Sequence, residues 1–327
     1  MKKRQTLLIT GILLIAAILL SFLLGRYKVS FQALIGVLTG QIKDTPEAIA
    51  ILRIRLPRIL MAVLVGACLS AAGAAYQGVF QNPMAAPDIL GASAGAGFGA
   101  AMAIFMNASS AGITAMAFAA SLVTVLLVMY VARFTKGERV LGIVLAGIMI
   151  SSLAQAGTSF IKLIADPTNK LPSITYWLMG SLVGATNNEL KFVIFPMLAG
   201  LIPLFILRWR INILTLGDEE AESIGVNARR VRAIVIICAT LITASAVSVS
   251  GMIGWVGLVI PHMMRRIVGS DYRYLMPASM LGGGLFLLLV DNFSRNISSA
   301  EIPIGILTAF IGAPFFLALI TRRGEFK

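Results

Sequence analysis

The sequence predicts an all-α polytopic membrane protein, and three observations carry that prediction. Its 327 residues are 58% hydrophobic and 13% charged, and the mean hydropathy of +0.91 is far above that of a soluble globule. Apolar runs long enough to cross a bilayer recur along the whole chain, since each crossing of roughly 30 Å needs about 20 residues. The basic residues gather between these runs. The lipid bilayer is therefore the expected surroundings of most side chains.

About ten transmembrane helices are expected, in one domain that covers residues 1–327. The candidate spans lie at residues 7–25, 59–80, 89–106, 111–132, 140–164, 190–207, 233–250, 252–264, 275–291 and 302–320. The third is interrupted by glycines and the eighth is short. The first follows a basic start, has the length of a full span and lacks a small-residue cleavage site before Arg26. We expect it to be retained as a span.

The basic residues predict the orientation of the chain. With the N-terminus inside, 17 of the 27 Lys and Arg residues fall in inner segments and ten in outer segments. This bias fits the positive-inside rule and predicts that the N- and C-termini are both cytoplasmic. The net charge of +13 then lies beside inner-leaflet phosphates, so membrane lipid and not nucleic acid is the expected partner. Six of the ten outer basic residues lie between Arg26 and Arg58, which the rule does not explain.

The chain lacks the residues that most enzymes need. His262 is the only histidine, and no ligand cluster surrounds it in the sequence. The glycines of Gly91–Gly99 do not have dinucleotide-binding spacing, so helix packing or a broken helix is expected there, and no phosphate-binding loop motif occurs. Cys68 and Cys238 each lie inside an apolar run and are expected to be packing residues. We predict no catalytic residue, no metal and no cofactor.

An ion-coupled carrier or channel is a second class to weigh. Such proteins usually place ionisable residues in the middle of their spans. In the expected topology, the acids nearest to spans are at span ends or in loops: Asp88, Asp166, Glu189, Asp291 and Glu301. Their placement counts against a proton-driven carrier, and the energy for transport is then expected to come from another protein.

Three spans carry small and polar residues at steps of three and four, which puts them on one helix face. These are Ser70, Gly73, Ala74, Gln77 and Gln81 in the second span, Ser151, Gln155, Thr158 and Ser159 in the fifth, and Thr240, Thr243, Ser248 and Gly251 in the seventh. One interpretation is hydrogen bonding between helices, at about 0.6 kcal/mol each. The other is a polar translocation path, with Ser70, Gln77, Ser151, Gln155, Thr158 and Thr243 as candidate lining residues.

The longest inner loop, residues 212–230, holds four of the chain's fourteen acids within five positions. Asp218 can cap a short helix with an acidic first turn, and Gly225 is suited to end it. A capped, rigid element favours a docking surface for a cytosolic partner over a solvated connector. The candidate docking residues are Leu216, Gly217, Asp218, Glu219, Ala221, Ile224 and Gly225, of which Leu216, Ala221 and Ile224 form a small apolar face.

Four ordered blocks of the sequence resemble one known family. They read RLPRILMAVLVGACLSAAGAAYQGVFQNPMAAPDILGASAGAG, LGDEEAESIGV, GMIGWVGLVIPHMMRRIVGSDYRYLMPAS and EIPIGILTAFIGAPFF, and together they cover about Arg53 to Phe316. They resemble the permease subunits of ABC importers for iron chelates, haem and cobalamin. The resemblance implies the cobalamin-importer-type permease fold with ten spans, and a single permease domain over residues 1–327.

The resemblance also implies partners. A second permease subunit, identical or paralogous, completes the pathway, two cytosolic ABC ATPases bind ATP and engage the inner loop, and an extracytoplasmic binding protein delivers the substrate. Arg55, Arg58 and Arg295 match family positions that meet acidic residues of the binding protein. The pair Pro261 and His262 also occurs in the family, and we expect the proline to stop the eighth span and the histidine to have a structural or coupling role.

The expected function is therefore that of a multi-pass permease subunit in a bacterial inner membrane. It is not itself an enzyme, because ATP hydrolysis belongs to the partner ATPase. A ferric siderophore is the expected substrate, and haem, cobalamin or molybdate are alternatives within the same class. An ATPase-independent secondary carrier or channel is the alternative outside it.

Overall fold

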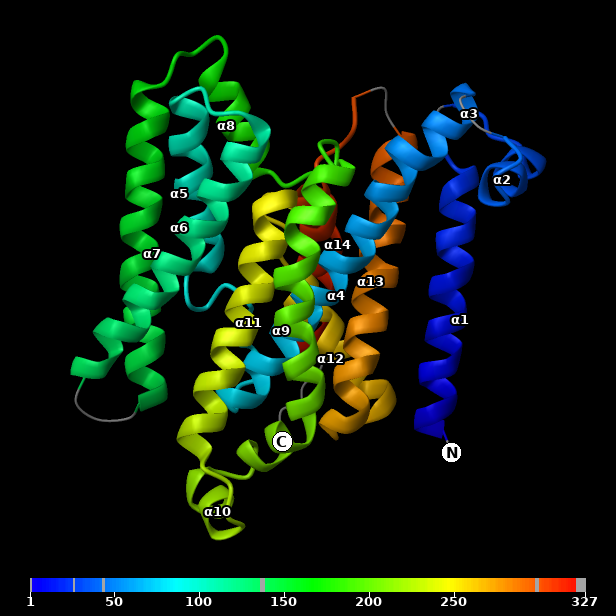
Figure 1. The fold of residues 1–327 in the computed structure, drawn as a ribbon. Helices are drawn as coiled ribbons and strands as arrows, with labels where there is room; N and C mark the ends of the chain where they lie inside the picture. Colours follow the sequence, from blue (N-terminus) through cyan, green and yellow to red (C-terminus); the bar gives the residue numbers. More distant parts are fainter. Residues whose placement is uncertain (1, 26, 43–44, 136–138, 298–299, 322–327) are drawn as a thin grey trace.

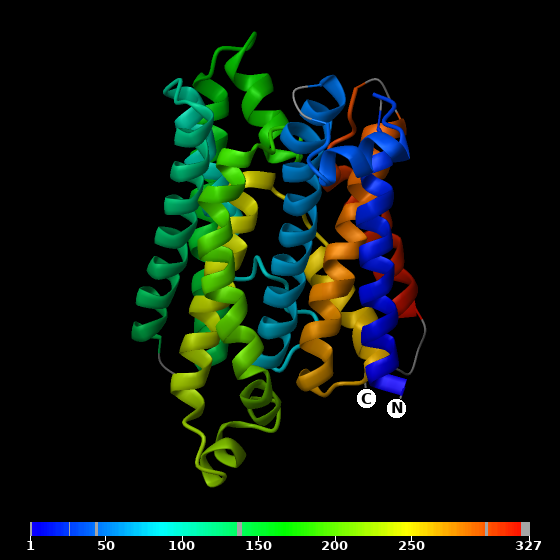
Figure 2. The ribbon, with the colours of Figure 1, turned by 45° about the vertical axis from the view of Figure 1, so that its right-hand side comes forward.

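The computed structural model describes residues 2–25, 27–42, 45–135, 139–297 and 300–321. Within these ranges the chain forms α-helices, one π-helical turn and one 3-10 turn, with no β-strand. The all-α prediction is confirmed. The helices run roughly side by side in one bundle (Figures 1 and 2).

Among the described residues, seven helical segments are long and apolar enough to cross a membrane. They are α1 (Lys2–Leu23), α4 (Leu56–Val79) with the preceding α3 (Pro46–Ile49) and π-helical η1 (Ala50–Arg55), α6 (Ser110–Val131) with η2 (Ala132–Phe134), α7 (Arg139–Ile164), α9 (Asn187–Leu214), α11 (Ala228–Ser250) and α13 (Tyr272–Ile297). Three shorter helices complete the bundle: α5 (Ala92–Phe105), α12 (Val256–Val268) and α14 (Ile304–Thr321). Each predicted span coincides with one of these helices, and the errors lie at the ends, as in α9, which extends well past residue 207.

Short helices mark the two ends of the bundle. At one end lie α2 (Phe31–Leu38), α3 and α8 (Lys170–Leu178), and at the other lies α10 (Asp218–Ser223) (Figure 1). Following the charge distribution, we name these the outer and the inner end. Helix α1 begins at the inner end (Figure 2). The sequence patterns did not predict α2, α3 or α8.

Helices α4, α11 and α13 form the centre of the bundle. In the most apolar 18-residue stretch of each of these spans, 78%, 67% and 61% of the residues are buried, whereas the value for α7 is 22%. Small residues allow the close approach: a Cβ built on Gly73 would lie 1.6 Å from the carbonyl oxygen of Gly257, and one on Gly66 2.2 Å from that of Gly283. In a bilayer such contacts between small residues are a main source of helix association.

Two of the shorter helices begin part-way along the bundle. The segments that lead into α5 and α12 lie within its height (Figures 1 and 2). Gly91 has a φ of +74° just before α5, and the helix is continuous from Ala92 through Gly99. Of the two expectations for these glycines, helix packing is the one that holds, because a Cβ on Gly95 would lie 2.2 Å from the hydroxyl of Thr124. The expectation that Pro261 stops the eighth span is wrong, because α12 continues to Val268. The carbonyl of Gly257, four residues before the proline, packs against Gly73 of α4.

Candidate functional site

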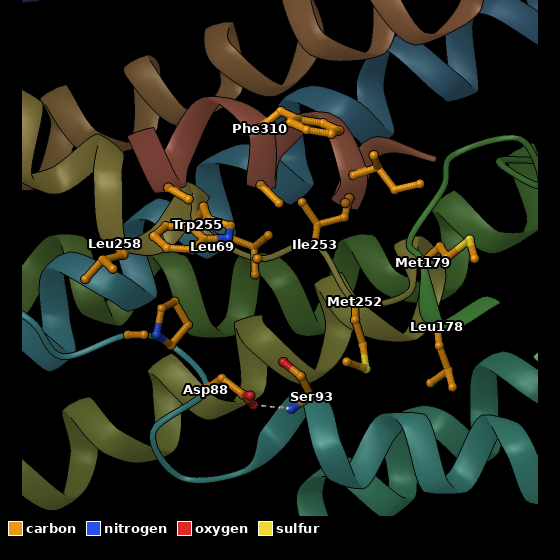
Figure 3. Close-up of a pocket in the computed structure, with 18 residues that line it drawn as sticks. Leu69, Asp88, Ser93, Leu178, Met179, Met252, Ile253, Trp255, Leu258 and Phe310 are labelled. Atoms are coloured by element: carbon orange, nitrogen blue, oxygen red, sulfur yellow. Dashed lines mark hydrogen bonds between the residues drawn. The ribbon is translucent and has the colours of Figure 1, made fainter. Parts of the chain in front are cut away.

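A cavity of about 810 Å³ lies where these interrupted helices meet. It is bounded by α4, the segment before α5, the end of α8, the segment between α11 and α12, and one face of α14 (Figure 3). Most of its walls are apolar, with Met179, Met252, Trp255 and Phe310 among the lining side chains. A largely apolar hollow with a few polar groups is the usual form of a small-molecule site, and irregular backbone at this depth is tolerated where it lines a cavity.

A junction of three glycines lies beside this cavity, and one of them, Gly305, lines it. A Cβ on Gly251 would lie 2.2 Å from the carbonyl oxygen of Trp177, and one on Gly305 would lie 2.3 Å from that of Met179. Gly180 has a φ of +74°, and its added Cβ would meet the carbonyl oxygen of Met252. The ends of α8 and α11 and the start of α14 therefore touch backbone to backbone, which larger residues would prevent.

Two features of the wall depart from ordinary core packing. Trp255 has a φ of +71°, a conformation that bulky residues rarely adopt and that concentrates at functional sites. Asp88 lines the cavity and accepts a hydrogen bond of 2.8 Å from the backbone N–H of Ser93, in the first turn of α5. Asp88 lies in the loop before α5, as expected for an acid at a span end or in a loop, and this loop enters the bundle. The glycine-rich third span and the short eighth span were the sequence signals of this site, but they did not identify its residues.

The three polar stripes do not meet in one passage within the chain. Ser70 is packed against Gly283 and Thr243 is fully buried, bonding the carbonyl of Ala239 in its own helix. On α7, Gln155 is exposed. The hydroxyls of Ser151 and Thr158 donate hydrogen bonds to carbonyls of their own helix, those of Gly147 and Ala154 respectively. The α4 and α11 stripes are therefore largely helix packing, with Gln81 exposed at the end of the first of them, and the α7 stripe reaches the surface at Gln155.

Gln77 is the exception on α4. Its side-chain oxygen accepts a bond of 2.9 Å from Arg265, and it lines a small inner cavity of about 270 Å³ with Thr215 and Tyr272. This cavity lies near the start of the loop that carries α10. Gln77 keeps its predicted role as a candidate lining residue, at the inner end of the bundle.

The three arginines expected to dock a binding protein are all buried. Arg58 forms ion pairs of 2.9 Å with Asp291 and 2.7 Å with Glu301, and Arg295 lies 3.3 Å from the same aspartate. Arg55 donates to the backbone carbonyls of Phe22, at the end of α1, and of Tyr27, in the segment after it. These five residues form what we call the outer charge cluster, which joins α1, α4, α13 and the segment before α14.

These three arginines therefore do not form a free charged face. Asp291, which was expected at a span end, is instead fully buried inside α13 and balances two of them. Docking through these arginines stays a prediction, and it now requires an acidic partner to displace Asp291 or Glu301. The exposed basic side chains described at this end of the bundle include those of Lys28, Arg53 and Lys191.

The inner loop has the expected short helix, with one difference at its start. Gly217 occupies the cap position with a φ of +127°, and Asp218 is the first helical residue. Asp218 does not cap the helix; it pairs with Arg232 of α11 at 2.5 Å. Gly225 follows the helix end with a φ of +83°, which confirms its terminating position.

The apolar face of this loop divides between core and surface. Ala221 is fully buried, whereas Leu216 and Ile224 are 62% and 58% exposed. Glu219 is also exposed. Two large apolar side chains on a polar loop outside the bundle form a small surface suited to a protein partner.

Hydrogen bonds connect the start of this loop to the rest of the bundle. Asn212 donates to Asp271 at 2.7 Å and accepts from the backbone of Tyr272 at 2.8 Å, and Gln81 donates to the carbonyl of Leu214 at 2.8 Å. Donation from Arg273, with a smaller contribution from Asn212, holds the pKa of Asp271 well below its usual range. The loop is therefore linked both to α4 and to the turn between α12 and α13.

The described residues thus form a bundle of apolar helices with a largely apolar cavity and an inner loop that is hydrogen-bonded to several of the helices. A model of the FecCD transport family matches residues 13–322, and the chain belongs to this family. Its relatives include permease proteins of import systems and of ABC transporters.

Named relatives and a solved structure agree with the family. The chain is 39% identical to the molybdate import system permease protein MolB of Haemophilus influenzae, covering 95% of this chain and 94% of that one. It is 42% identical to a probable iron chelatin transport system permease protein of Helicobacter pylori, covering 84% and 83%. A solved inward-facing ABC transporter described as of the metal-chelate type superposes with a TM-score of 0.89 at 38% identity, covering 98% of this chain and 99% of that one.

Proposed function

We propose that this chain is the membrane permease of a bacterial inner-membrane ABC importer that carries a ferric siderophore. Two copies, or one copy and a paralogue, surround the pathway, two cytosolic ATPases bind the inner loop, and an extracytoplasmic binding protein delivers the chelate. The chain itself contributes no catalytic residue and no cofactor. ATP is bound by the partner.

The observation that carries this proposal is the inner loop. Leu216 and Ile224 are exposed at one end of the bundle, and the loop that holds them is bonded to α4, α11 and the α12–α13 turn. A partner that binds these side chains can therefore displace the loop, and with it the several helices to which the loop is bonded. That arrangement suits coupling to an ATPase and has no evident use in a carrier that works alone.

The siderophore is supported by the iron chelatin relative, and molybdate is the second candidate because of MolB. Ferric siderophores and molybdate are carried by importers of the same architecture. The class of transporter therefore does not show which of the two substrates this chain carries.

Two measurements test the proposal. An ATPase should copurify with the full-length protein in detergent, and deletion of the gene should abolish uptake of radioactive iron from one or more ferric siderophores while uptake of labelled molybdate is unchanged. Loss of molybdate uptake alone would select the second candidate. If all uptake is retained and no ATPase copurifies, the alternative of a secondary carrier or channel would be favoured.

A further inference from the structure

The cavity between α5, α12 and α14 has a chemistry that discriminates among possible ligands. Its 810 Å³ is far larger than a tetrahedral oxyanion needs and is within the range typical of sites for organic ligands. Trp255, Met252 and Met179 offer flat and polarisable apolar surface. The walls therefore match the organic shell of a chelate better than a small, hydrated ion.

Charge gives the second constraint. Among the described residues that line the cavity, Asp88 is the only one with a charged side chain. The close-up shows its carboxylate directed toward the first turn of α5, where it bonds Ser93 (Figure 3). No lysine, arginine or histidine is among the lining residues described. Asp88 is exposed, and a negative charge in the cavity wall, with no basic side chain among the described lining residues, disfavours an anionic ligand.

We propose that this cavity is a binding site for a neutral or cationic organic metal chelate, and that Asp88 excludes anionic ones. The inference rests on the proposed function and narrows it. A ferric trihydroxamate is neutral, because three singly charged hydroxamates balance Fe³⁺. A ferric tris-catecholate carries three negative charges and molybdate two. The site accepts the first and rejects the other two.

A reporter cysteine in the wall tests this directly. Ala309 lines the cavity from α14, so Ala309→Cys is made in full-length protein lacking Cys68 and Cys238. The labelling rate with a small water-soluble maleimide is measured in detergent with each of three probes: a neutral ferric trihydroxamate, a ferric tris-catecholate and molybdate. We expect the trihydroxamate to slow labelling at least about fivefold and the two anions to have no effect. Ser223→Cys, on the exposed inner helix α10 outside the spans, is the matched control and should be indifferent to all three.

The role of Asp88 has its own variant. Asp88→Asn keeps an oxygen to accept from Ser93 and removes only the charge. The tris-catecholate should then protect the Ala309→Cys reporter, with an apparent affinity raised about tenfold or more. Asp166→Asn, in the exposed turn between α7 and α8, is the control acid and should leave the discrimination unchanged.

The outcomes separate this inference from the proposed function. Equal protection by the anionic chelate and the neutral one, no protection by the trihydroxamate, or unchanged discrimination in Asp88→Asn would overturn the inference. Gene deletion that abolishes iron uptake only from an anionic siderophore would overturn it too, and would leave the importer function standing. Protection by the trihydroxamate with iron uptake unaffected by deletion would support the site and defeat the siderophore function.

Discussion

The outer charge cluster and the inner loop have similar sequence signals but opposite surroundings in the structure. Each concentrates charge in a chain that has few charged residues. At the outer end, Arg58 is buried with its neutralising acids, and the cluster ties four segments together. At the inner end, the acids stay exposed and Leu216 and Ile224 project from the bundle. The first region holds the fold, and the second has a surface left for a partner.

The largest effect is expected from breaking the outer charge cluster. Arg58→Met leaves Asp291 buried with only the more distant Arg295 as counter-charge, and removing one partner of a buried pair typically costs about 3–5 kcal/mol. Unfolding of the detergent-solubilised protein measures the loss. Arg53→Met, which removes an exposed arginine one turn away, should change the free energy of unfolding by less than about 0.5 kcal/mol. Equal stability of the two variants would contradict the distinction between the regions.

The inner loop should respond in the reverse way. The double variant Leu216→Asp and Ile224→Asp should reduce uptake at least about tenfold, because charge is placed where a partner must bury apolar surface. Its unfolding should match the wild type within about 0.5 kcal/mol, since both side chains are already exposed. Transport assays and ATPase pull-down measure the first effect. Normal uptake with unchanged ATPase binding would show that this loop is only a connector.

A smaller effect is expected at the pair between Asp218 and Arg232. The aspartate side chain is half exposed, so Asp218→Asn should lower the free energy of unfolding by no more than about 1 kcal/mol. If the pair orients α10, uptake should still fall a few-fold and the ATPase should still bind. Glu219→Gln on the same helix removes an exposed acid and is the control. Identical transport by both variants would remove the pair from the coupling mechanism.

The smallest effect concerns steering at the outer end. Since Arg55, Arg58 and Arg295 are buried, the exposed Lys28 and Arg53 should carry any long-range attraction to an acidic binding protein. Reversing either to glutamate should slow association about two- to fivefold at low salt, and the difference should vanish near 1 M salt. The association rate on membranes at several ionic strengths is the measurement. A wild-type rate independent of salt would argue against electrostatic docking at this end.

Much of the fold could be predicted because a bilayer leaves few choices. Apolar length and basic residues alone located ten spans, and Gly225 marked the end of α10, since these signals depend on local sequence and solvent. The short outer helices were missed because they lack the length of a span, although Ser30 caps the start of α2 and Thr45 followed by Pro46 marks the start of α3. Asp218 was misplaced by one position, because its distant partner Arg232 decides where its side chain goes.

What the sequence by itself determined is the class of the molecule, its membrane crossings, its family and the position of the inner loop. Only the tertiary structure decided which polar groups are free. Arg58 meets Asp291 across 233 positions of sequence, and Asp88 reaches the cavity because glycines let α4, α8, α11, α12 and α14 approach one another closely. Spacing along one helix shows which residues share a face. It does not show what that face meets, because the neighbour comes from a distant part of the chain and the energy of a charge depends on that neighbour.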